Sequence, residues 1–230
     1  MSLLVVVPAF NEAESISKVI LDIKANIPTA DILVVDDGSS DQTAAVAKSN
    51  DVPVLSLPFN VGVGGALRVG FLYASRHSYS QVLQIDADGQ HKASEAKALL
   101  SSADGFQIVI GSRFATADSN YSASLLRRIA MRWLAMLISR ICKTRLTDVT
   151  SGFRLTSGPA IELFSREYPV EYLGDTVESL VLAHKAGYSI KEVPVVMAQR
   201  VTGAPSQNLI KSTWYLIRAT IVVILSLIHK

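Results

Sequence analysis

The segment VLQIDADGQ, residues 82–90, joins an apolar run to a pair of aspartates and decides how the chain folds. Its first four residues are typical of a buried strand, which ends where Asp86 and Asp88 begin. Alternate residues at a strand end point the same way, so the two carboxylates are predicted to converge beyond the edge of a sheet. In α/β proteins, ligands bind at the carboxyl ends of strands, and this segment is therefore a candidate site.

The oxygen atoms that follow this strand are suited to a metal ion. The carboxylates of Asp86 and Asp88 and the amide of Gln90 are hard ligands, which fit Mg²⁺ or Mn²⁺ with positions left for phosphate oxygens. The alternative is an acidic turn that simply ends the strand, because Asp and Gly favour turns. His91 is expected to be a loop residue and not a ligand.

Strand-like and helix-like stretches alternate along the chain. Strands are predicted at residues 3–7, 32–35, 54–57, 82–85, 108–110 and 190–195, and helices at roughly 13–25, 41–49, 64–77, 92–101, 125–141 and 175–186. Residues 148–155 read as a loop. Continuous Val/Ile/Leu runs alternating with helices indicate an α/β fold, with a parallel sheet covered on both faces.

Composition narrows the class of protein. The chain has 230 residues, of which 49% are hydrophobic and 18% charged, as in a globular protein with a substantial core. A net charge of +2 argues against generic nucleic-acid binding. Cys142 is the single cysteine, which excludes an intramolecular disulfide, and it is expected in the core. The N-terminus has no basic leader before its short apolar run, so a cytoplasmic protein is expected.

Two segments combine basic and apolar residues without acids. Between Asp118 and Asp148 the charged residues are Arg127, Arg128, Arg132, Arg140, Lys143 and Arg145. Such a pattern suggests phosphate or an anionic membrane surface, or else an ordinary solvated helix face. Residues 208–228 are predicted to form a helix whose most apolar part is shorter than the ~20 residues that span a bilayer. It is interpreted as a membrane-interface or partner-binding helix, with a buried core helix as the alternative.

Polar side chains follow the first, second, fourth and fifth predicted strands. Glu12 follows the first strand, Asp36 and Asp37 the second, and Arg113 the fifth. The acceptors suit ribose hydroxyls and the N–H edge of a base, while a metal at the fourth strand suits a diphosphate. Arg113 is a planar donor for phosphate or a sugar hydroxyl. The glycines of residues 60–70 lack the Lys-Ser/Thr of a P-loop and are read as letting a helix approach the ligand.

A set of ordered motifs links the chain to a known family. The motifs are VVVPAFNE, VVDDGSSDQT, NVGVGGALRVGF, DADGQH, GSRF, TSGFRL and EVPVVMAQRVTG. With them the chain resembles the family 2 glycosyltransferases of the GT-A (Rossmann-like) fold, and more closely the dolichol-phosphate mannose synthase and polyprenyl-phosphate glycosyltransferase branch. The resemblance covers about residues 3–206. It implies one mostly parallel GT-A domain over residues 1–206, followed by a C-terminal amphipathic helix over residues 207–230.

The resemblance also implies a role for each matching residue. The implied nucleotide-sugar site comprises Pro8, Phe10, Glu12, Asp36, Asp37, Asp86, Ala87, Asp88, Arg113 and Arg200. Within it, Asp37 with Asp36 meets the base, and Arg200 closes over the diphosphate from a late loop. Asp88 and Gln90 hold the divalent metal. Ser151 and Arg154 shape the sugar and acceptor side, and Glu178 is the carboxylate of the following helix. Arg127 and Arg128 are candidate guides for the acceptor. Gln207 departs from the branch, which often has a lysine there.

The expected activity is metal-dependent, inverting transfer of a hexose from a nucleotide sugar of the GDP-mannose or UDP-glucose type. The expected acceptor is a polyprenyl or dolichyl phosphate at the cytoplasmic face of the membrane. One alternative keeps the fold but uses a glycan or lipid hydroxyl, with Asp175 or Glu178 as general base. Another is a non-catalytic nucleotide-sugar-binding subunit whose C-terminal helix recruits a membrane protein. A nucleotidyltransferase is disfavoured, because no Gly-rich basic loop follows the first strand.

Overall fold

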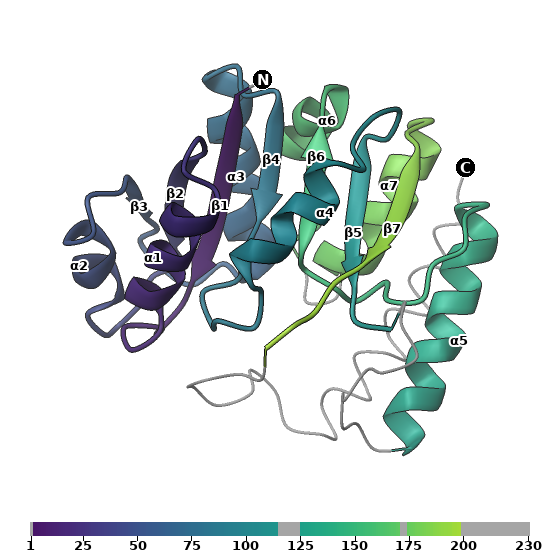
Figure 1. The fold of residues 1–230 in the computed structure, drawn as a ribbon, viewed down its shortest axis with the longest axis horizontal. Coiled ribbons are helices and arrows are strands. Elements are labelled where there is room, and N and C mark those ends of the chain that lie inside the picture. The colour runs from purple at the N-terminus through teal and green to yellow at the C-terminus, as the bar shows by residue number, and fades with distance from the viewer. Residues whose placement is uncertain (1, 115–124, 171–173, 199–230) are drawn as a thin grey trace.

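A central sheet runs through the computed structural model, which describes residues 2–114, 125–170 and 174–198. The described residues form seven strands in the order β3-β2-β1-β4-β6-β5-β7 (Figure 1). The strands are β1 (Leu3–Ala9), β2 (Asp31–Asp36), β3 (Val54–Ser56), β4 (Gln81–Gln84), β5 (Ile108–Ser112), β6 (Arg154–Ser157) and β7 (Ile190–Pro194). The six predicted strands are all present, with boundaries shifted by up to two residues.

The sheet is mostly parallel, as predicted, with one reversed strand. β6 runs antiparallel to both β4 and β5, and all other neighbouring pairs are parallel. Because β6 opposes both of its neighbours, β4 and β5 still point the same way. The carboxyl ends of β1, β2, β4 and β5 therefore lie at one edge of the sheet, and the first residue of β6, Arg154, lies there too.

The predicted loop over residues 148–155 is confirmed for residues 148–153, but its last two residues begin strand β6. Arg154 pairs in register with Gln84 of β4 and Ile110 of β5. The strand is short, begins with a charged residue and has no Val/Ile run, so its sequence carries little strand signal. Its position between two buried strands supplies the hydrogen bonds that the local sequence does not indicate.

Helices cover both faces of the sheet. They are α1 (Ile16–Asn26), α2 (Thr43–Lys48), α3 (Val63–Arg76), α4 (Ala96–Leu100), α5 (Leu125–Ile141), α6 (Pro159–Glu167) and α7 (Ser179–Lys185). A 3₁₀ turn, η1 (Ala93–Glu95), precedes α4, and a π-helical turn, η2 (Gly174–Glu178), precedes α7. Helix α6 was not predicted. The predicted helix at 208–228 lies outside the described residues. No helix in the described ranges has the length and apolar character needed to cross a bilayer.

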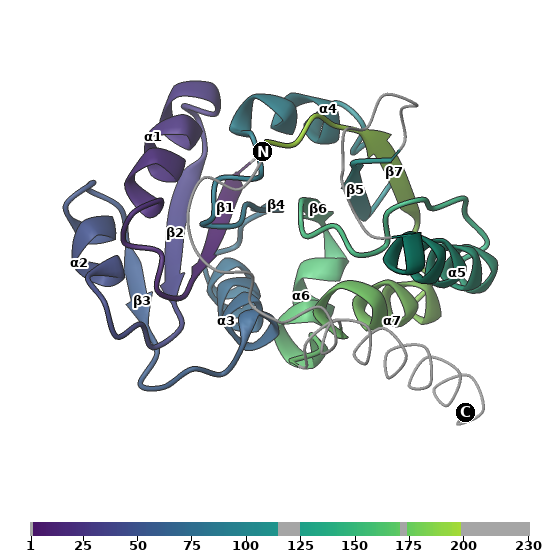
Figure 2. The ribbon, with the colours of Figure 1, turned by 90° about the horizontal axis from the view of Figure 1, so that it is seen from below.

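Alternate strand residues build two separate cores. Leu4 and Val6 of β1 point to the face that α3, α5, α6 and α7 cover, while Val5 and Val7 point to the face of α1, α2 and α4. Figure 2 shows α1 and α4 on one side of the sheet and α3, α6 and α7 on the other. This alternation in a strand buried on both faces confirms the predicted covered sheet.

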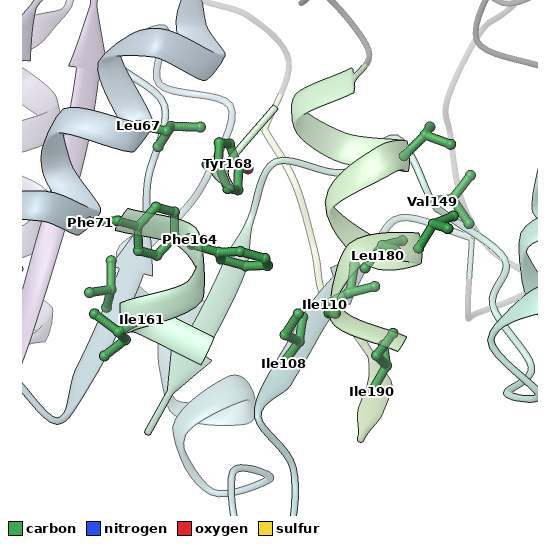
Figure 3. Close-up of a cluster of buried hydrophobic side chains, with 14 of the residues drawn as sticks. Leu67, Phe71, Ile108, Ile110, Val149, Ile161, Phe164, Tyr168, Leu180 and Ile190 are labelled. Atoms are coloured by element: carbon green, nitrogen blue, oxygen red, sulfur yellow. The ribbon is translucent and has the colours of Figure 1, made fainter. Parts of the chain in front are cut away.

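The core under α3 and α6 is aromatic. The rings of Phe71, Phe164 and Tyr168 lie 5.0 to 5.2 Å apart between centroids (Figure 3). The glycines of α3 make this close packing possible, since a Cβ on Gly64 would lie 2.3 Å from the carbonyl oxygen of Pro169. The atoms that Gly64 and Gly70 let the helix approach belong to Pro169, Val170 and Val6, and contact of this loop with a ligand stays a prediction.

Candidate active site

The carboxyl edge of the sheet gathers most of the residues predicted to bind a nucleotide sugar. The loops after β1, β2, β4 and β5 meet there, because neighbouring parallel strands end at the same edge. The predicted residues at this edge are Pro8, Phe10, Glu12, Asp36, Asp37, Asp86, Ala87, Asp88, Gln90 and Arg113. Arg200 lies outside the described residues. Arg127 and Arg128 lie in the first turn of α5, where only the backbone is described.

Hydrogen bonds lock the loops after β1 and β2 together. The N–H of Asn11 donates to the Oγ of Ser39 at 2.9 Å, and its Oδ1 accepts from the N–H of Ser40 at 2.9 Å. The N–H of Glu12 donates to the Oγ1 of Thr43 at 2.8 Å. These contacts fix the two loops relative to each other. The ring of Phe10, in the loop after β1, is exposed.

Asp36 and Asp37 are both buried but have different partners. The carboxylate of Asp37 accepts from the N–H groups of Val61 and Gly62, at 2.8 and 2.9 Å. Burial raises the pKa of Asp37, these two donors oppose the rise, and the charge of Asp36 adds to it. Asp36 accepts from the N–H of Ser39 at 3.2 Å through Oδ1, and its Oδ2 has no hydrogen-bond donor among the described residues. Asp37 therefore fixes a loop, while Asp36 retains an acceptor.

His91 organises the loop that carries Asp86. Its Nδ1 accepts the backbone N–H of Asp86 at 3.0 Å, so in the neutral ring the proton is on Nε2, which lies 3.7 Å from the Oδ2 of Asp86. The ring is buried and stacks on Phe153, with centroids 5.1 Å apart. The amide of Gln84 donates to the Oδ1 of Asp86 at 3.0 Å. His91 was predicted to be a loop residue, and it is the buried residue that holds this loop.

The residues around Asp88 form a hydrogen-bonded acidic turn, one of the two structures that the sequence allowed. The Oδ1 of Asp88 accepts the N–H of Gln90 at 3.0 Å, and Gly89 has a φ of 76°. The carbonyl of Gln90 accepts the N–H of Ala198 at 2.9 Å, which brings the chain after β7 against this turn. Within the described ranges no group of three or more His, Cys, Asp or Glu side chains is placed to hold a metal. The oxygen-bearing side chains in the sequence of this turn are the carboxylates of Asp86 and Asp88 and the amide of Gln90.

Gly152 lies against the carboxylate of Asp86. A Cβ at this position would lie 2.9 Å from the Nε2 of Gln84 and 3.1 Å from the Oδ2 of Asp86. Contacts this short require neighbouring atoms to move. The segment before β6 thus sets the position of Asp86, a relationship that the sequence did not reveal.

Arg113 is held by a residue that the sequence analysis did not single out. Its Nε lies 2.7 Å from the Oδ2 of Asp148, and its Nη2 lies 2.8 Å from Oδ1. Asp148 is buried, and its own N–H donates to the Oε2 of Glu192 at 3.0 Å. The guanidinium predicted to bind phosphate or sugar is therefore fixed by protein. The sequence offered one indication that Asp148 has a special role: it is the first acidic residue after an acid-free stretch, and it lies just before TSGFRL.

Ser151 and Arg154, predicted on the acceptor side, are buried in the wall of the site. The hydroxyl of Ser151 donates to the carbonyl of Gly111 at 2.6 Å. The guanidinium of Arg154 donates to the carbonyl oxygens of Ser151, Thr176 and Val149, at 2.7 to 2.9 Å. Burial lowers the pKa of Arg154, and nearby acidic groups, including Asp86 and Asp175, oppose the decrease. Ser151 thus ties the segment before β6 to β5, and Arg154 ties β6 to the turn η2.

Asp175 and Glu178 lie on the turn η2 and not on a regular helix as predicted. Asp175 is buried, Glu178 is half-buried, and the carbonyl of Asp175 accepts from the hydroxyl of Ser179 at 2.6 Å. Single π-helical turns occur often at functional sites. The hydrogen bond from Arg154 to the carbonyl of Thr176 places this turn on the β6 side of the carboxyl edge.

Comparisons with known proteins identify the family of this chain. The model of the family described as Glycosyl transferase family 2 matches residues 4–164. An undecaprenyl-phosphate mannosyltransferase of Micrococcus luteus is 30% identical, over 88% of this chain and 86% of that protein. A polyprenol monophosphomannose synthase of Mycolicibacterium smegmatis is 29% identical, over 89% of this chain and 80% of that protein.

A solved structure shares the fold. It is a glucosyl-3-phosphoglycerate synthase from Mycobacterium tuberculosis in complex with Mn²⁺, uridine diphosphate and phosphoglyceric acid. It aligns with a TM-score of 0.73 and 21% identity, over 98% of this chain and 78% of that one. This likeness confirms the predicted GT-A fold.

Proposed function

The chain belongs to glycosyl transferase family 2 and is a glycosyltransferase, and on this premise we propose that it transfers a hexose from a nucleotide sugar to a polyprenyl phosphate. The observation that carries the proposal is the meeting of the buried acceptor Asp36 and the oxygen-rich turn of Asp86 and Asp88 at one sheet edge. Two relatives are named an undecaprenyl-phosphate mannosyltransferase and a polyprenol monophosphomannose synthase, which supports the choice of acceptor.

The nucleoside is proposed to bind over the loops after β1 and β2. Asp36 is the residue assigned to the base or ribose, because its Oδ2 has no hydrogen-bond donor among the described residues. A buried acceptor without a donor is unfavourable, so a ligand N–H or O–H there gains binding free energy. Asp37 is assigned to hold the loop at Val61 and Gly62 beneath the nucleoside. Pro8, Phe10 and Glu12 are assigned to the wall of the pocket.

The turn after β4 is proposed to hold Mg²⁺ or Mn²⁺. Its donors are the carboxylates of Asp86 and Asp88 and the side-chain amide of Gln90, all hard oxygen ligands, and their small number leaves positions for diphosphate oxygens. The residues present therefore fit such an ion. When bound, the ion supplies positive charge to the diphosphate that leaves during transfer.

The proposed transfer makes one bond and breaks another at the anomeric carbon. A phosphate oxygen of the acceptor bonds to that carbon while its bond to the diphosphate oxygen breaks, and the electron pair leaves with the nucleoside diphosphate. Attack from the opposite side inverts the configuration. A phosphate monoester is already ionised near neutral pH, so no general base is needed. Arg113, held by Asp148, is assigned to the sugar-phosphate side, and Arg200 to the diphosphate.

The acceptor also determines where the enzyme works. A polyprenyl phosphate lies in a bilayer, so we propose peripheral association with the cytoplasmic face of the membrane. Residues 1–206 are proposed as the catalytic domain and residues 207–230 as a segment that contacts the membrane or a membrane protein. Transfer to a hydroxyl acceptor is the competing outcome, and it would require Asp175 or Glu178 to act as a base.

Acceptor competition tests this proposal. Labelled GDP-, UDP- and dTDP-hexoses would be incubated with Mn²⁺, purified enzyme and matched short-chain acceptors, polyprenyl phosphate and the corresponding polyprenol. We expect product from one nucleotide class and only with the phosphate. Transfer to the polyprenol that is lost in Asp175→Asn or Glu178→Gln would contradict the assignment of the acceptor. Absence of transfer from every donor would contradict the function itself.

A further inference from the structure

Helix α5 presents large apolar side chains to solvent. Ile129, Trp133 and Met136 are 45%, 68% and 51% exposed. Their spacing of four and three residues places them on one stripe of the helix. The solvent face of a surface helix ordinarily carries charged residues, so this stripe is unusual for a face that contacts only water.

The opposite face of α5 already provides its contact with the core. Leu134 and Ile138 are buried in the cluster that includes Leu180 of α7. The exposed stripe is therefore additional to the packing that holds the helix in the fold. A helix that is apolar on its buried face and along its exposed stripe has a second contact to make.

The charges around the stripe identify the partner. Arg132 and Arg140 are exposed on α5, and Lys143 and Arg145 are exposed just after it. No Asp or Glu occurs in the sequence between Asp118 and Asp148. An apolar stripe with a tryptophan and flanking basic residues matches a bilayer surface that contains anionic lipid, where the ring occupies the headgroup boundary.

We propose that α5 docks the enzyme on an anionic bilayer, with Trp133 inserted at the interface. The proposal rests on the proposed function, in which the acceptor is a membrane lipid. Figure 1 shows α5 beyond β7, at the end of the sheet, reaching past the edge where β5 ends. Docking through this helix brings the carboxyl edge and its site toward the surface that contains the acceptor.

Tryptophan fluorescence tests the insertion directly. The chain has two tryptophans, Trp133 and Trp214, so Trp214→Phe leaves Trp133 as the reporter and Trp133→Phe leaves Trp214. Vesicles of phosphatidylcholine with phosphatidylglycerol would carry brominated acyl chains as quenchers. We expect the emission of Trp133 to shift to shorter wavelength and to be quenched. A Trp133 that is neither shifted nor quenched, in protein bound to these vesicles or in protein that fails to bind them, would overturn the proposal.

Vesicle flotation tests the contribution of the stripe and the charges. The double variant Trp133→Ala/Met136→Ala should bind anionic vesicles at least tenfold more weakly than the wild type. Leu21→Ala is the matched control, because Leu21 is exposed on α1, far from α5. Binding should also fall between 0.1 and 1 M salt, since the Debye length falls from about 10 Å to about 3 Å. Equal binding by the double variant and the control would contradict docking through α5.

Activity measurements separate this proposal from the proposed function. We expect the double variant to transfer normally to a water-soluble short-chain acceptor and at least tenfold more slowly to the same headgroup embedded in vesicles. An equal rate on both acceptors would overturn docking through α5 and leave the transferase function standing. If the wild type transfers to neither acceptor, the proposed function fails, and the quenching of Trp133 still decides whether α5 inserts.

Discussion

The buried carboxylate of Asp148 accepts two parallel hydrogen bonds from Arg113, from Nε at 2.7 Å and from Nη2 at 2.8 Å. The pair joins the end of β5 to the segment that leads into β6. A bidentate pair of this kind fixes both the position and the orientation of the guanidinium. Glu192 of β7 accepts the backbone N–H of Asp148 at 3.0 Å, so Asp148 links the end of β5, the segment before β6 and β7 at the carboxyl edge.

Replacing Asp148 by Asn should destabilise the fold. The amide has one acceptor oxygen in place of two and removes the negative charge that faces the Arg113 guanidinium, a change that costs about 3 kcal/mol for a buried pair. For a chain of this size, that corresponds to a fall in Tm of roughly 6–12 °C. Thermal denaturation followed by circular dichroism measures it, with the exposed Asp104→Asn as control. A Tm equal to that of the control would show that the pair adds little.

His91 is predicted to position the DADGQ turn without contacting the substrate. His91→Ala removes the acceptor of the partly buried N–H of Asp86, which costs about 1 kcal/mol and should lower kcat/KM by roughly tenfold. His91→Asn offers an oxygen near the position of Nδ1 and should recover part of both stability and turnover. Steady-state kinetics and thermal denaturation of the two variants test this. Equal activity of the alanine and asparagine variants would contradict a role for the Nδ1 acceptor.

Gly152→Ala should reduce activity more than stability. The added Cβ would lie 3.1 Å from the Oδ2 of Asp86, so the carboxylate must shift at the site of proposed metal and diphosphate binding. Gly105→Ala is the control, because its Cβ would meet nothing within 4 Å while its φ of +78° imposes a backbone cost. We expect the first variant to lose turnover and the second to lose about 1 kcal/mol of stability with turnover retained. The reverse pattern would contradict the role of this contact.

Cys142 should be unreactive in the native protein. Burial raises the pKa of its thiol to about 11, so little thiolate exists at neutral pH, and the side chain is inaccessible. The pKa of this thiol is higher in the folded protein than the ordinary value of 9.0. Burial of the neutral thiol therefore contributes fully to folding stability below pH 9, and this contribution is lost as the pH rises toward 11. The native protein should react slowly with a disulfide reagent at pH 8. The unfolded protein should react with one equivalent of the reagent per chain. Fast native reaction would contradict the packing of Cys142 beside α7.

The parts of the fold predicted from sequence are those with a local signal. Val82, Leu83 and Ile85 form a continuous apolar run, and a chain with several such runs between helices folds as a covered sheet. Strand β6 has no such run, and its pairing with β4 and β5 depends on residues about 70 and 45 positions earlier in the chain. Local patterns do not contain that information.

Local sequence patterns likewise predicted only part of the site. Asp86 and Asp88 were placed at the edge because they end a strand, and the structure has them there. The pairing of Arg113 with Asp148 spans 35 residues, and that of Asp86 with His91 requires a particular loop conformation. Ser151 and Arg154 were assigned to the acceptor side, but their side chains bond to backbone inside the wall. Side-chain partners of this kind follow from the assembled fold.

Transfer by Asp88→Asn is the most direct test of the proposed function. Labelled hexose transfer to a short-chain polyprenyl phosphate would be measured for the wild type with Mn²⁺, the wild type with chelator, Asp88→Asn, and Asp104→Asn as control. Because charge stabilisation of the leaving diphosphate contributes several kcal/mol, we predict at least a ~hundredfold loss with chelator and in Asp88→Asn. The circular dichroism spectrum should stay unchanged. Turnover in Asp88→Asn that matches Asp104→Asn and still requires Mn²⁺ would contradict the assignment of the metal and the diphosphate to this turn.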